Sequence, residues 1–211
     1  LCLIMEQFDI AICGYGPVGS TFAGLMGKLG HKVLVIEKNS GPSPTARAIN
    51  TDGEQLRTFD RLGIAEKVVE NSNEVHRVHF SDAKLKPIQT IDQPIGVSAM
   101  GWPNQILFYQ PELEGFIRSS VEAIENIAIK EGTELLDFKD DENGVTLQCK
   151  TSNGNEEYKA KFLIGCDGAS SSVRKKLQVT LDDLEYNQEW LVIDAHLTQK
   201  VNIPKNDAMQ V

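Results

Sequence analysis

The stretch CGYGPVGSTFAGLMGKLGHKVLVIEKN, residues 13–39, has three glycines at its start and an acidic residue near its end. A short apolar run precedes the glycines at residues 8–13, and a second follows at residues 32–37; both are typical of buried strands. Between them, apolar residues recur at helical spacing until Gly30, a natural helix end. The order predicts a β-α-β unit with parallel strands. The apolar residues that recur at this spacing, typical of an amphipathic helix, are Val18, Phe22, Leu25, Met26 and Leu29.

Gly14, Gly16 and Gly19 form the pattern G-x-G-x-x-G directly after a strand and at the start of a helix. The first glycine permits a tight turn, the second lets backbone approach a pyrophosphate, and the third allows close packing. The helix start offers free N–H groups and a partial positive charge. Glu37 ends the second strand, where a carboxylate can accept hydrogen bonds from ribose hydroxyls. The pattern predicts a dinucleotide site and leaves FAD and NAD both open.

Further helices and strands are expected along the rest of the chain. Thr51 and Glu54 fit a capping box at the start of a helix that Gly63 ends. Other helices are expected at residues 64–70, about 111–127 and 173–177. Strands are expected within residues 74–98 and at 127–130, 134–139, 145–150, 162–166 and 189–197.

A second motif, Asp167-Gly168, follows the apolar run FLIGC and precedes a serine-rich turn. Asp-Gly alone is a common turn, but together with the glycine pattern it resembles the single-component flavoprotein aromatic hydroxylases. Three further stretches share the resemblance: PTARAINTDGEQLRTFDRLGIAEKV (44–68), FYQPELE (108–114) and NQEWLVIDAHL (187–197). The similarity covers residues 7–211, and its nearest branch is the 3-(3-hydroxyphenyl)propionate hydroxylase-like proteins.

The resemblance implies an α/β fold with a Rossmann-type FAD-binding domain: a parallel sheet with a small antiparallel β-meander. It also implies the beginning of a mixed-sheet substrate domain. The FAD-binding domain would comprise residues 1–75 and 101–180. The partial substrate domain would comprise residues 76–100 and 181–211.

The resemblance also implies FAD as the cofactor and assigns its contacts. The three glycines would hold the pyrophosphate and Glu37 the adenosine ribose, while Leu135 would pack near the adenine. Arg47 would reach the flavin, and Gln110 would bond the ribityl chain. Asp167 would lie near the pyrophosphate and also serve NADH or NADPH. The full cofactor set expected is Gly14, Gly16, Pro17, Val18, Gly19, Glu37, Lys38, Arg47, Gln110, Leu135, Asp167 and Gly168.

The implied reaction is the hydroxylation of a small phenolic substrate by O2, through a flavin hydroperoxide, with NADH or NADPH as the reductant. Members of the group carry a third motif, a Gly-Asp pair before a helix, which residues 1–211 lack. The chain therefore resembles an N-terminal part, and no catalytic residue is assigned. Two alternatives stay open: a flavin-binding fragment without turnover, and another Rossmann enzyme, either a different FAD oxidoreductase or an NAD-dependent dehydrogenase.

Composition limits the partners of the chain. A net charge of −9 disfavours binding to nucleic acid and to anionic membranes. Four scattered cysteines without a CxxC pair, and no basic leader or long apolar run, favour a cytoplasmic protein. His76 and His79 would face opposite sides of a strand, so no metal site is expected.

Overall fold

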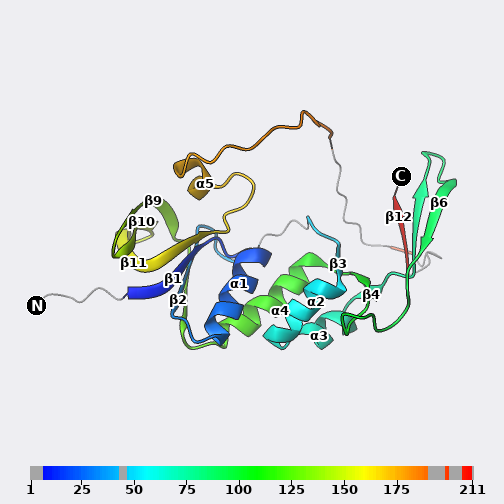
Figure 1. The fold of residues 1–211 in the computed structure, drawn as a ribbon, viewed down its shortest axis with the longest axis horizontal. Coiled ribbons are helices and arrows are strands. Elements are labelled where there is room, and N and C mark those ends of the chain that lie inside the picture. Colours follow the sequence, from blue (N-terminus) through cyan, green and yellow to red (C-terminus); the bar gives the residue numbers. More distant parts are fainter. Residues whose placement is uncertain (1–6, 43–46, 190–197, 200–205, 211) are drawn as a thin grey trace, which may run out of the picture. The chain divides into compact units, whose positions relative to one another are not determined.

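The computed structural model describes residues 7–42, 47–189, 198–199 and 206–210 (Figure 1). The chain separates into two compact units. The first unit comprises residues 1–43 and 117–187, and the second comprises residues 44–116 and 188–211. This division follows the density of contacts within the chain. The domain bounds implied by the family resemblance divide the chain differently, into a part that binds FAD and a part that binds substrate. Those bounds stay a prediction.

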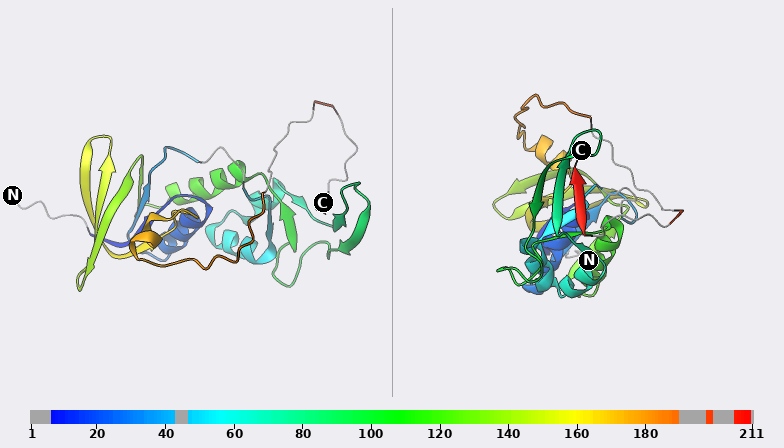
Figure 2. Two further views of the ribbon diagram at one scale, coloured as in Figure 1. Left: turned by 90° about the horizontal axis from the view of Figure 1, so that it is seen from above. Right: turned by 90° about the vertical axis from the view of Figure 1, so that its right-hand side faces the viewer.

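The first unit is built on one six-stranded sheet with the order β8-β2-β1-β11-β10-β9. The strands are β1 (Gln7–Cys13), β2 (Val33–Glu37), β8 (Ile127–Glu131), β9 (Glu134–Asp141), β10 (Gly144–Thr151) and β11 (Gly154–Gly165). Strands β8, β2, β1 and β11 run parallel, whereas β11, β10 and β9 pair antiparallel as a meander (Figures 1 and 2). The predicted α/β class, the β-α-β unit and the small meander are confirmed.

The core of this sheet gathers side chains from the parallel strands and from the meander. Its buried members are Phe8, Ala11, Leu34, Ile36, Val145, Leu147, Cys149 and Ala160. Strand β2 is buried along almost its whole length, as expected of a central parallel strand whose two faces are both covered.

Helix α1 (Pro17–Lys28) is present, and its large apolar residues are half-buried or exposed. Val18 is 71% exposed and Leu29 is 69% exposed. The buried residues are small instead: Gly19, Ser20, Ala23, Gly24 and Gly27. A Cβ on Gly27 would lie 2.5 Å from Ile127 Cδ1, so the helix lies too close to β8 for larger side chains. Close approach displaced the large apolar residues from the buried face.

Among its described residues, the second unit contains two short sheets, β3-β7-β4 and β12-β5-β6, and three helices or parts of helices. Its strands are β3 (Asn50–Asp52), β4 (Asn73–Glu74), β5 (Arg77–Ser81), β6 (Pro87–Asp92), β7 (Gln105–Leu107) and β12 (Asp207–Gln210). Its helices are α2 (Gly53–Leu62), α3 (Ala65–Glu70) and the first turns of α4 (Gln110–Glu122).

Several predicted boundaries needed correction. The N-cap of α2 is Asp52, one residue after the predicted Thr51, and its side chain accepts the N–H of Gln55 at 2.9 Å. Gly63 ends the helix with a left-handed φ of 79°, as predicted. Helix α4 ends at Glu122, before the predicted limit. The last predicted helix is α5 (Ser172–Lys176), and the predicted strand at 189–197 lies outside the described residues except for Glu189.

Candidate functional site

The three glycines of the G-x-G-x-x-G turn have different structural roles. Gly14 has a φ of +105°, and a Cβ there would lie 2.3 Å from the Cys166 carbonyl oxygen. A Cβ on Gly19 would lie 2.0 Å from the Gly14 carbonyl oxygen. Gly16 has an ordinary φ of −75°, and a Cβ there would meet no atom of the described residues within 4 Å. The fold therefore needs Gly14 and Gly19, whereas the space beside Gly16 is open.

The start of α1 presents unused backbone donors. Gly16 is the N-cap and has no side-chain cap, and Pro17 occupies the first helical position. Within the described residues, the N–H groups of Gly16, Val18 and Gly19 donate no hydrogen bond. Free donors and a partial positive charge at a helix start favour an anion such as a pyrophosphate.

Glu37 lies between the glycine turn and the loop after β2. Its Oε2 accepts the Tyr15 N–H at 2.9 Å, and its Oε1 accepts the backbone N–H of Asn39 at 2.8 Å and the side-chain Nδ2 at 2.9 Å. Lys38, the next predicted residue, is exposed beside it. A carboxylate has about four acceptor positions, so capacity remains for hydroxyl donors such as those of a ribose.

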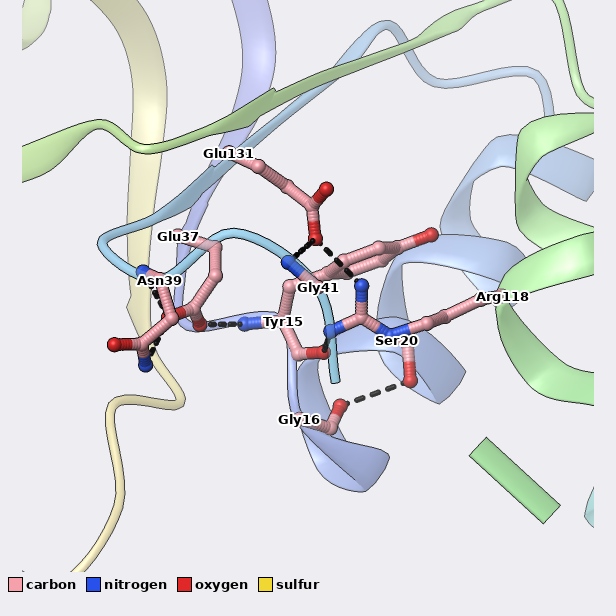
Figure 3. A network of polar contacts seen from close by, with 8 residues as sticks. All are labelled: Tyr15, Gly16, Ser20, Glu37, Asn39, Gly41, Arg118 and Glu131. Carbon is pink, nitrogen blue, oxygen red and sulfur yellow. Dashed lines mark hydrogen bonds and ion pairs between the residues drawn. The ribbon is translucent and has the colours of Figure 1, made fainter. Parts of the chain in front are cut away.

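Figure 3 shows an arginine network beneath the turn that the sequence analysis missed. Arg118 of α4 donates from Nη1 to Glu131 Oε1 at 2.6 Å and from Nη2 to the Tyr15 carbonyl at 2.9 Å. The same Glu131 oxygen accepts the Gly41 N–H at 3.1 Å. The sequence offered one signal for this network: Arg118 is a charged residue directly after Ile117, which is buried in an amphipathic helix.

Asp167 closes the turn that leads into α5. Its carboxylate accepts the hydroxyls of Ser171 and Ser172 and the backbone N–H groups of Ser172 and Val173. Burial alone would raise the pKa of Asp167, but the hydrogen bonds from Ser171, Ser172 and Val173 outweigh it and the pKa is lowered. Gly168 follows with a left-handed φ of 82°. In this structure the Asp167 carboxylate therefore forms hydrogen bonds within the loop that leads into α5.

We expect Asp167→Ala to lower the free energy of unfolding by about 1–2 kcal/mol at neutral pH, the usual loss when a side chain that accepts free N–H groups at a helix start is removed. Because the folded pKa is depressed, this stabilisation is present above the unfolded pKa of about 3.9. It is lost as pH falls through the lower folded pKa. Urea unfolding followed between pH 2 and 7 measures this, with the exposed Asp182→Asn as control. Equal stability of the Asp167 variant and the wild type would contradict a stabilising role of these hydrogen bonds.

Leu135 lies on β9, whereas Cys166 directly precedes Asp167 and donates its N–H to the Cys13 carbonyl at 2.7 Å. Leu135 of β9 is half-buried and packs against the sheet core. The Cys13 thiol is buried, which raises its pKa to about 12, and burial also raises the pKa of Cys166. These thiols remain protonated at neutral pH and are poor nucleophiles.

In the second unit, the two residues predicted to contact the flavin part of the cofactor, Arg47 and Gln110, are hydrogen-bonded to each other. The buried Gln110 accepts the backbone N–H of Arg47 at 2.5 Å and that of Ala48 at 2.8 Å through Oε1, and its Nε2 donates to Glu114 at 2.7 Å. The Arg47 residue itself is exposed. The glutamine therefore fixes the arginine-bearing loop, and the roles of both toward a cofactor stay predictions.

His76 and His79 of this unit have different acidic partners. His79 lies 2.9 Å from the Thr90 hydroxyl through Nδ1 and 3.1 Å from Asp207 through Nε2. Hydrogen bonds from His79, then from Arg77, lower the pKa of Asp207. His76 lies 3.6 Å from Glu74. No cluster of three metal-binding side chains occurs in the part of the chain that the structure describes.

Comparison with known proteins gives consistent matches. The sequence model of the family described as "FAD binding domain" matches residues 7–211. The chain is 34% identical over 192 residues to 3-(3-hydroxy-phenyl)propionate/3-hydroxycinnamic acid hydroxylases of Shigella sonnei and Escherichia coli, covering 90% of the chain and 34% of each relative. The chain thus spans about a third of the length of these curated relatives.

Solved structures give the same picture of the fold. The crystal structure of p-nitrophenol 4-monooxygenase from Pseudomonas putida matches with a TM-score of 0.79 at 26% identity, covering 84% of this chain and 45% of that one. The flavin-dependent monooxygenase PieE, solved in complex with FAD and substrate, matches with a TM-score of 0.74 at 24% identity, covering 84% of this chain and 33% of that one.

No helix within the described ranges is long and apolar enough to cross a membrane.

Proposed function

Since the chain belongs to the FAD binding domain family, we propose that it supplies the dinucleotide-binding part of an FAD-dependent monooxygenase that acts on an aromatic substrate. The family predicted from the motifs is thereby confirmed. The relatives at 34% identity are hydroxylases, which supports the enzyme class. The activity of a whole protein built on this chain is a proposal, because the chain spans about a third of those relatives.

The observation that supports cofactor binding most directly is the open start of α1. The N–H groups of Gly16, Val18 and Gly19 are unused within the described residues, and a Cβ on Gly16 would meet only open space. A pyrophosphate at this position would accept these donors without any rearrangement of the turn. Glu37 would receive the ribose hydroxyls with its remaining lone pairs.

The other assigned residues extend this proposal. Pro17 would preset the first helical turn, and Lys38 would flank the ribose site. Leu135 would border the adenine, and Asp167 with Gly168 would approach the pyrophosphate from β11. Arg47 and Gln110 would serve the flavin end, where Gln110 already fixes the Arg47 loop.

When bound, the flavin supplies the redox chemistry between a reduced nicotinamide, O2 and the substrate. We propose NADH or NADPH as the reductant, a small phenolic compound as the substrate, and the route of oxygen activation implied by the resemblance. The cytoplasmic location and the ligand-based domain bounds given above belong to the same proposal. The protein's task is to hold the cofactor and to limit access of water.

Titration of the chain with FAD tests the proposal. We expect the flavin absorption bands to shift and its fluorescence to change with saturation at a 1:1 ratio, while NAD binds much more weakly. Tight NAD binding with no response to FAD would favour the NAD-dependent dehydrogenase and contradict the proposal. Isothermal titration with both dinucleotides under the same buffer measures the difference.

A second candidate function, flavin binding without turnover, follows from the length of the chain relative to the hydroxylases. It predicts FAD binding without substrate-dependent oxidation of NADH or NADPH. Absorbance at the nicotinamide band, with 3-(3-hydroxyphenyl)propionate as the trial phenol, separates it from the complete enzyme.

A further inference from the structure

The glycine turn is held by contacts to both ends of one residue. The Tyr15 N–H is bound by Glu37 at 2.9 Å, and the Tyr15 carbonyl is bound by Arg118 at 2.9 Å. Gly14 and Gly16 flank this residue, and the chain has no cis peptide among its described residues. In a trans peptide the N–H points away from the preceding carbonyl. The Gly16 N–H therefore points away from Arg118, on the side where the turn is open.

We infer that Arg118 is a positioning residue for the cofactor site: by holding the Tyr15 carbonyl, its guanidinium aims the Gly16 N–H at the pyrophosphate. This inference rests on the proposed binding of FAD. Arg118 does not itself touch the cofactor in this assignment. It acts through one peptide group, which Figure 3 shows between the arginine and the start of α1.

Glu131 completes the positioning device. Its Oε1 accepts from Arg118 Nη1 at 2.6 Å and from the Gly41 N–H at 3.1 Å. The glutamate thereby orients the guanidinium and ties it to the loop after β2, the loop that also carries Asn39 and follows directly on Glu37. One ionic network thus links the pyrophosphate turn to the ribose-side loop.

The burial of Arg118 favours a positioning role over a purely stabilising one. The residue is only 8% exposed, and its Nε has no partner within the described part of the chain. The guanidinium lies 4.3 Å from the centroid of the Tyr15 ring, whose hydroxyl is also buried without a partner there. Buried polar groups without partners cost free energy of folding. An apolar side chain would fill this space without that cost, but it could not hold the Tyr15 carbonyl.

The test compares FAD, ADP and adenosine as ligands of the 211-residue chain and its variants. Adenosine reports the ribose and adenine contacts alone, whereas ADP and FAD also need the pyrophosphate donors. We expect Arg118→Met to weaken FAD and ADP about 10- to 100-fold, the range of a lost charge-assisted hydrogen bond. Adenosine binding should change less than about twofold on the same reasoning. Arg118→Lys, which keeps a donor and the charge, should recover part of the loss.

Glu131→Gln tests the second link, and Glu125→Gln is its matched control, because Glu125 is exposed at the surface of the same unit. We expect the Glu131 variant to weaken FAD severalfold and the Glu125 variant to bind as the wild type does. The double variant with Arg118→Met should be no weaker than Arg118→Met alone, since both residues act through one network. Circular dichroism confirms that each variant is folded.

Three results would overturn the inference. Arg118→Met that binds FAD within about twofold of the wild type would show that the carbonyl needs no arginine. An equal loss for FAD, ADP and adenosine would indicate a general loosening of the unit. A wild-type chain that binds no FAD would overturn the proposed function and this inference together, so the wild-type titration comes first and separates the two failures.

Discussion

Gly16→Ala is expected to abolish measurable FAD binding while leaving the chain folded. The Cβ would meet no atom of the residues that the structure describes within 4 Å, and the φ of −75° suits alanine. The free energy of unfolding should therefore change by less than about 0.5 kcal/mol. The same methyl group would stand where the pyrophosphate approaches the backbone. We expect the affinity for FAD to fall by at least about 100-fold, equivalent to about 2.7 kcal/mol.

The measurement pairs a flavin fluorescence titration with urea unfolding of the apo chain. Gly115→Ala is the matched control, because Gly115 lies within α4, has no neighbour that a Cβ would meet, and is remote in sequence from the turn. The control should bind FAD as the wild type does, with stability raised by up to about 1 kcal/mol from helix propensity. Normal FAD binding by the Gly16 variant would place the pyrophosphate elsewhere.

The contrast between the glycines also shows how far sequence reasoning reaches. Local order along the chain, a strand, a glycine turn and a helix, predicted the β-α-β unit and the position of Glu37. The pattern assigned the three glycines by analogy. It could not tell that Gly14 and Gly19 are required by backbone contacts while Gly16 is not, because the closest contacts of Gly14 come from Cys166, which lies far along the chain.

Two features that the sequence did not reveal have the same origin in tertiary packing. Periodicity indicates an amphipathic helix that includes Val18 and Leu29, but the distance between helix and sheet decides which side chains fit, and periodicity does not contain that distance. The hydrogen bonds of Arg118 could not be predicted from the sequence for a similar reason. Arg118 and Tyr15 are 103 residues apart, and only the folded sheet brings them together.

Gly14→Ala is expected to destabilise the chain more than any other single change proposed above, by about 3–5 kcal/mol in the free energy of unfolding. Its Cβ would lie 2.3 Å from the Cys166 carbonyl oxygen and 2.6 Å from the carbonyl carbon. The backbone there cannot easily move aside, because the Cys166 N–H donates to the Cys13 carbonyl at 2.7 Å and continues the pairing of β1 with β11. The φ of +105° adds conformational strain to this overlap.

Gly30→Ala separates the two causes. Gly30 has a φ of +89°, but a Cβ there would meet no atom within 4 Å, so alanine suffers the conformational cost alone, about 1–2 kcal/mol. Urea unfolding of both variants then gives the cost of steric overlap as their difference. If the two variants lose equal stability, the overlap with Cys166 is relieved by small backbone shifts, and the turn is held by its φ angle alone. If the Gly14 variant loses far more stability than the Gly30 variant, the backbone at the end of β11 cannot shift to relieve the overlap. The shape of the cofactor site then depends on β11 as much as on the glycine motif itself.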